Sequence, residues 1–104
     1  MDPRSLDEQL RFAISHRRLL QVGYKGAFRV VEPHDYGIQK GKTRLLTFQL
    51  HRSGGSPRKS VEGWRLLDVS EIERCVVLDD TFHGSRGTSH QHHYQWDVLH
   101  ARVS

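Results

Sequence analysis

Two arginines, Arg29 and Arg65, lie among apolar neighbours in segments that alternate as β-strands do. A guanidinium on a strand presents a planar fork of donors, which binds a phosphate or carboxylate through parallel hydrogen bonds. The sequence therefore predicts anion binding at Arg29 and Arg65. The alternative is that each arginine pairs at the surface with a nearby acid such as Glu32 or Asp68.

More basic residues gather around the polar turn that begins at Gln39. Basic side chains interleaved with aromatic ones bind single-stranded nucleic acid through phosphate contacts and base stacking. We therefore expect nucleic-acid contacts at Lys40, Lys42 and Arg44, with Tyr24, Tyr36, Phe48 and Trp64 as the available rings. Phe48 and Trp64 fit the hydrophobic core better than a stacking surface.

Three polar side chains, His34, Asp35 and Tyr36, follow Pro33 at the end of a predicted strand. They have the chemistry to line a pocket mouth by hydrogen bonding and stacking. Local turn chemistry, in which Asp35 accepts a backbone bond, explains the same residues slightly better.

Three histidines near the C-terminus, His90, His92 and His93, have side chains that could bind a metal ion. A structural zinc site needs four ligands, commonly with thiolates. The single cysteine, Cys75, lies far away in an apolar run, and the nearest carboxylate is Asp97. We therefore expect a solvated loop here, with no metal and no cofactor.

The composition limits the class of protein. The 104 residues suit one domain, and the formal net charge of +4 favours anionic partners. There is no secretory signal and no apolar run long enough to cross a membrane, so we expect a cytoplasmic protein without a membrane partner. The sequence carries no phosphate loop, no dinucleotide fingerprint and no recognisable nucleophile–base pair. It reads as a binding module rather than an enzyme.

The element pattern predicts one helix followed by short strands. A capping box from Ser5 to Glu8 opens a helix that ends near His16. Strand segments are predicted at 20–24, 28–33, 43–51, 64–69 and 76–78, with a short bent strand at 36–38, turns at 25–27 and 39–42 and a helical turn before Ile72. Residues 96–103 form a terminal helix or strand. We predict a mainly β (α+β) fold, a small strongly bent barrel of about five strands with the helix across one open end. Residues 1–82 form this domain, and residues 83–104 form an irregular tail that docks on the barrel or on a partner chain.

The order of these segments resembles the WYL domain of bacterial regulators. The likeness begins at residues 13–18 and 20–26, where a helix end leads into a strand with Tyr24 and Gly26. It continues through residues 28–34, a segment that runs from an arginine to a proline. Two later segments complete it: residues 63–72, an arginine strand that runs into Ile72, and residues 79–82, which end in Phe82. The name-giving tripeptide is replaced by Arg44-Leu45-Leu46, so only its leucine remains. The likeness covers roughly residues 6 to 82.

The resemblance implies an Sm-like or SH3-like barrel and a role in ligand sensing for transcription regulation. On this resemblance, Arg29 and Arg65 match the basic pocket positions, with Tyr24 and His34 near them. The family domain usually follows a helix-turn-helix reader. This chain has a single helix before its first strand, so it would be a standalone member.

Three functions remain open. The first is a sensor that binds an anionic ligand, a nucleotide or an oligonucleotide, in a pocket built from Tyr24, Arg29, His34 and Arg65. The second is a general nucleic-acid-binding barrel that uses its whole basic surface. The third is a protein-interaction domain that forms a homodimer or binds a regulatory protein, because a small barrel exposes strand edges that can pair.

Overall fold

The computed structural model describes residues 2–53, 62–87 and 95–104. In chain order the elements are α1 (Leu6–Ser15), β1 (Arg18–Tyr24), β2 (Ala27–Gln39), β3 (Lys42–Ser53), β4 (Gly63–Asp68), the 3-10 turn η1 (Val69–Glu71), β5 (Ile72–Thr81) and β6 (Val98–Arg102). The prediction of a mainly β domain with one N-terminal helix is confirmed, and so is the helical turn before Ile72.

The helix begins where the capping box predicts. The Ser5 hydroxyl accepts a hydrogen bond from the Glu8 backbone, and the Glu8 carboxylate accepts one from the Ser5 backbone. Leu10, Ala13 and Ile14 lie on one side of α1 and are buried against the sheet. The helix therefore supplies one wall of the core.

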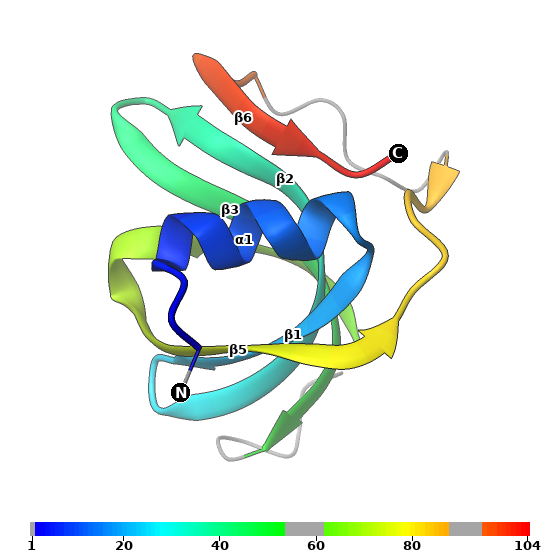
Figure 1. The fold of residues 1–104 in the computed structure, drawn as a ribbon. Coiled ribbons are helices and arrows are strands. Elements are labelled where there is room, and N and C mark those ends of the chain that lie inside the picture. Colours follow the sequence, from blue (N-terminus) through cyan, green and yellow to red (C-terminus); the bar gives the residue numbers. More distant parts are fainter. Residues whose placement is uncertain (1, 54–61, 88–94) are drawn as a thin grey trace.

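All strands belong to one antiparallel sheet with the order β4-β3-β2-β1-β5, and β6 pairs with the second half of β2. Figure 1 shows the long strands bending around a common interior, with α1 lying across it and β6 beside β2. Among the described residues β4 and β5 do not pair, so the sheet is open at these two strands, and the predicted closure into a barrel is not found.

Two tight turns set the register of the central strands. Lys25–Gly26 and Lys40–Gly41 both have positive φ, at 50° and 77° in each pair, which is the geometry of a two-residue hairpin turn. They join Tyr24 to Ala27 and Gln39 to Lys42 as cross-strand partners. The predicted turns are therefore confirmed.

The prediction that a strand ends at Pro33 is wrong. β2 continues through Pro33 to Gln39 and absorbs the short strand predicted at 36–38. Pairing with β1 ends at Val31 and pairing with β6 begins only at Asp35, so Pro33 lies where that edge of β2 has no neighbour. A proline costs no ladder hydrogen bond at such a position.

The core lies between α1 and the concave face of the sheet. Its buried members include Leu20, Val22, Val31, Leu45, Leu67 and Val103. We call the sheet face that carries these side chains the inner face and the opposite face the outer face. Val103 follows β6, and its N–H donates to the His34 carbonyl at 2.8 Å, so the end of the tail packs on the same sheet as the N-terminal strands.

Candidate anion-binding site

Arg29 and Arg65 point to the inner face. Side chains alternate along a strand, so Arg29 lies on the same side of β2 as Val31, two residues later. By the same rule Arg65 lies on the same side of β4 as Leu67. Both arginines are half-buried. The structure therefore brings these two predicted residues to one face.

The guanidinium of Arg29 contacts only neutral groups. Its Nη1 donates to Oε1 of Gln49 at 2.9 Å, and its Nε donates to the Tyr24 carbonyl at 3.4 Å. The guanidinium carbon lies 5.6 Å from the centroid of the Tyr24 ring. In the described part of the chain Arg29 forms no ion pair, and Glu32, the acid considered as its partner, pairs with Arg86 instead at 2.8 Å.

Two further guanidinium groups act on Arg29. Burial is the main cause that lowers the pKa of Arg29, and the charges of Arg52 and Arg65 lower it further. The pKa of an arginine remains far above neutrality even when it is lowered, so the side chain stays charged. Arg29, Arg52 and Arg65 thus form a group of like charges, which we call the arginine cluster.

Arg52 is a member of the cluster that was not predicted from the sequence. Counting back from the Lys40–Gly41 turn pairs Arg52 with Arg29, and the observed register has this pair. Simple alternation along β3 from Leu45 would instead place Arg52 on the outer face. A one-residue bulge at Leu50 shifts the register between these two regions and turns Arg52 toward Arg29.

Buried polar residues next to the arginine cluster hold its strands together by hydrogen bonds. Gln49 and Thr47 are fully buried on β3, and the Thr47 hydroxyl donates to the Arg65 carbonyl at 3.0 Å. The Tyr24 hydroxyl accepts a hydrogen bond from the Asp68 backbone at 3.0 Å, so this predicted residue holds β1 against β4. A fixed frame of this kind lowers the cost of ordering the arginine side chains around an anion.

His34 lies elsewhere. Its fully buried ring packs against Trp64, with centroids 4.8 Å apart, and against Phe82 at 5.6 Å. Trp64 and Arg65 are consecutive on β4 and point to opposite faces, so His34 is on the outer face, away from the arginine cluster. Burial lowers the pKa of His34, which keeps the ring neutral at pH 7.

Asp35 and Tyr36 join elements to the sheet. The fully buried Asp35 carboxylate accepts hydrogen bonds from Nε and Nη2 of Arg102 on β6, at 3.0 and 3.2 Å. The Tyr36 hydroxyl donates to Asp7 of α1 at 2.6 Å. These contacts give both residues a structural role in place of the pocket mouth considered from the sequence.

The basic turn lies at the far end of the β2–β3 hairpin. Lys40 belongs to the turn and Lys42 follows it, whereas Arg29 and Arg52 pair at the opposite end of the same two strands. Lys42 lies 3.9 Å from Asp68, and Arg44 pairs with Gly37 and Asp68 across its neighbouring strands. The three predicted nucleic-acid contacts therefore do not join the arginine cluster. The histidines at positions 90, 92 and 93 lie outside the described residues.

No family model matches this sequence, and no curated protein or solved structure does so either. The likeness to the WYL domain therefore stays a prediction from the sequence. In the described part of the chain no helix is long and apolar enough to cross a membrane.

Proposed function

We propose that this chain is a binding module that holds an anionic ligand, a nucleotide or an oligonucleotide, on the arginine cluster of Arg29, Arg52 and Arg65. The observation that carries this proposal is the Arg29 guanidinium, which is half-buried, bonded only to neutral acceptors and adjacent to two like charges. A bound phosphate would place negative charge beside these three guanidinium groups and would accept several charge-assisted hydrogen bonds.

We also propose that this open, bent sheet is related to the Sm-like and SH3-like small barrels and that the chain belongs to the WYL family. The bent sheet with the order β4-β3-β2-β1-β5 and the helix across its interior support this assignment. We further propose that the module is cytoplasmic and serves a regulatory purpose, as the likeness of its sequence to the WYL domain of bacterial regulators implies. The competing hypothesis is that the chain binds single-stranded nucleic acid across its wider basic surface.

Thermal unfolding in the presence of mono-, di- and oligonucleotides tests the proposal. A ligand at a hundredfold excess over its Kd stabilises the folded state by about 2.7 kcal/mol, which is a clear shift in Tm. We expect a shift that persists at physiological salt, that Arg29→Ala or Arg65→Ala abolishes, and that Lys42→Ala leaves unchanged.

Two outcomes would overturn the proposal. Shifts that every polyanion causes and that salt removes would favour the general nucleic-acid binder, since broad phosphate contacts are strongly salt-dependent. No shift with any anion would leave the arginine cluster without a ligand role and favour a protein-interaction domain.

A further inference from the structure

The second edge of β5 has no strand partner among the described residues. The two-residue Lys25–Gly26 turn makes Tyr24 and Ala27 a hydrogen-bonded pair. Main-chain groups alternate in direction along β1, so those of Val22 also bond to β2. The main-chain groups of Gly23 and Gln21 bond to β5. Gly23 pairs with Arg74 of β5, and Gln21 pairs with Val76.

The alternation of main-chain groups along β5 then determines which N–H and C=O groups lie at its open edge. Arg74 and Val76 direct their N–H and C=O groups toward β1. Cys75 and Val77 therefore direct theirs away from the sheet. Glu73 is the extra residue of a bulge between the Gly23 and Tyr24 pairs and does not follow this alternation. A row of unpaired N–H and C=O groups is a template on which another strand can pair.

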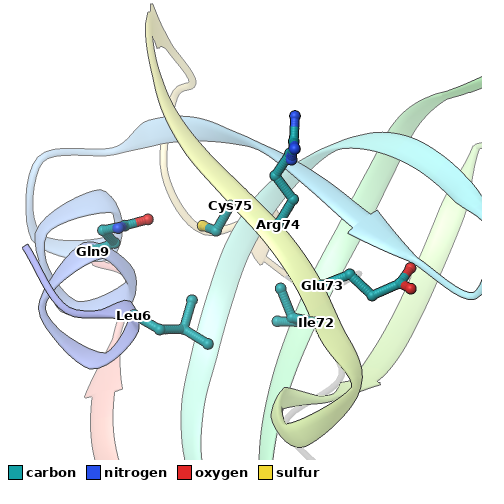
Figure 2. A pocket seen from close by; sticks show the side chains of 6 residues that line it. All are labelled: Leu6, Gln9, Ile72, Glu73, Arg74 and Cys75. Carbon is teal, nitrogen blue, oxygen red and sulfur yellow. The ribbon is translucent and has the colours of Figure 1, made fainter. Parts of the chain in front are cut away.

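A groove runs along this edge, between β5 and the first turns of α1. One hollow of about 160 Å³ is lined by Leu6, Gln9 and the consecutive residues 72–75, and an adjoining hollow of about 550 Å³ is lined by Asp2, Gln9 and residues 74–77. Because successive side chains of a strand point to opposite faces, an unbroken run of lining residues means that the groove follows the strand edge. Figure 2 shows Leu6 and Gln9 extending from the helix toward β5 and the Cys75 side chain lying on the helix side of the strand.

Gln9 places an unused acceptor at this groove. The side chain is 9% exposed, and its Nε2 donates to the Arg4 carbonyl at 2.9 Å, which fixes the orientation of the amide. Its Oε1 is buried and has no hydrogen-bond partner. A buried acceptor left unsatisfied costs about 1–3 kcal/mol, so an occupant that brings an N–H group is favoured here.

The charges along the edge indicate what kind of strand fits. Four of the 12 acidic residues of the chain lie within residues 71–80, at Glu71, Glu73, Asp79 and Asp80, and Arg74 is the one basic residue in that range. All five are exposed, and one of the four acids, Asp79, is paired with Arg18 of β1 at 2.9 Å. The chain as a whole carries +4, so this edge is locally opposite in sign to the rest of the protein. A second copy of β5 would bring the same acidic residues and be repelled, whereas a basic segment would be attracted.

We propose that the open edge of β5 is a docking site for an extended basic segment of another polypeptide, which adds to the sheet as a strand beside α1. The main-chain groups of Cys75 and Val77 pair with the added strand, and Oε1 of Gln9 accepts one further N–H. Alternate apolar side chains of the segment pack on Leu6 and Ile72, while its lysines or arginines face the acidic rim. This site is separate from the arginine cluster, which repels a basic ligand.

The probe is a fluorescein-labelled, end-capped peptide of alternating lysine and valine, and the readout is fluorescence anisotropy with the full chain. The matched ligands are an alternating glutamate and valine peptide and a lysine–valine peptide that is N-methylated on one edge, which cannot donate to a strand. We expect binding of the lysine–valine peptide and at least about a tenfold weaker affinity for both controls, which corresponds to about 1.4 kcal/mol.

Two variants locate the site on the protein. Val77→Pro removes an N–H that faces the open edge and not β1, so the protein is expected to fold and to lose peptide binding by at least about tenfold. Val77→Ala keeps this N–H and should leave binding within about twofold of the unchanged protein. Equal binding of the basic and the N-methylated peptide overturns the proposal without relying on any variant, as does an absence of binding, and unchanged binding by a folded Val77→Pro protein overturns the location.

Discussion

Replacing Arg102 by alanine measures how firmly the C-terminal strand is held to the sheet. The Asp35 carboxylate has no exposed surface, and Arg102, whose side chain is 37% exposed, supplies two hydrogen bonds to it. Breaking a fully buried pair costs about 3–5 kcal/mol because the remaining charge is left uncompensated. Water reaches the arginine side of this pair and reduces that cost, so we expect Arg102→Ala to lower the free energy of unfolding by about 2 kcal/mol. For a domain of about this size the corresponding fall in Tm is about 10 °C.

Urea and thermal unfolding measure this loss, with Lys42→Ala as the matched control. Lys42 is 61% exposed and lies 3.9 Å from Asp68, so its removal should cost no more than about 0.5 kcal/mol. In the double variant with Asp35→Asn, the neutral amide no longer needs a counter-charge, and much of the loss from Arg102→Ala should disappear. Equal losses in Arg102→Ala and Lys42→Ala would refute the view that a buried ion pair anchors β6.

Three further predictions concern other positions. Burial raises the pKa of the Cys75 thiol to about 12, so a disulfide reagent at pH 8 should label the native protein far more slowly than the urea-unfolded protein; equal rates would contradict this. Burial lowers the pKa of His34, so below pH of about 6.5 the unfolded chain binds a proton that the folded chain does not, and stability should fall as the pH drops; His34→Phe should flatten this fall in Tm, and an unaltered slope would count against it. A Cβ at Gly37 would come within 2.2 Å of the Val98 carbonyl oxygen, so Gly37→Ala should cost about 1–3 kcal/mol and speed amide exchange along β6, whereas protected β6 amides would show that the strand tolerates the methyl group.

The local signals of the sequence were sufficient for the helix and the turns. The Ser5–Glu8 capping box and the Lys25–Gly26 turn each depend on a few adjacent residues, so neighbouring types predict them well. The separation of His34 from Arg29 was not predicted, because the predicted strand ended at Pro33 and the resemblance grouped the two residues. Only the observed continuation of β2 places them on opposite faces.

The long-range pairings could not be read from local patterns. β2 passes through Pro33 only because β1 ends and β6 begins on either side of that position, and neither fact is encoded near the proline. β6 exposes Val98 by 47% and Leu99 by 41%, so it lacks the alternation of a half-buried strand. Its place beside β2 depends on contacts such as the pair of Asp35 with Arg102, whose members are 67 residues apart.

Two single-residue bulges between β2 and β3 determine which side chains of this strand pair meet. The bulge at Leu50 on β3 reverses the alternation for the following residues and places Arg52 opposite Arg29, which completes the arginine cluster. The bulge at His34 on β2 reverses it again, so that Tyr36 faces inward to Asp7 of α1 and Asp35 is left to pair with Arg102. The same strand pair thus gathers positive charge at one end and binds the helix and β6 at the other. Because the proposed ligand site and a structural anchor depend on opposite ends of the β2–β3 hairpin, alanine in place of Arg29 should leave β6 in place, and loss of β6 should leave residue 29 paired with Arg52.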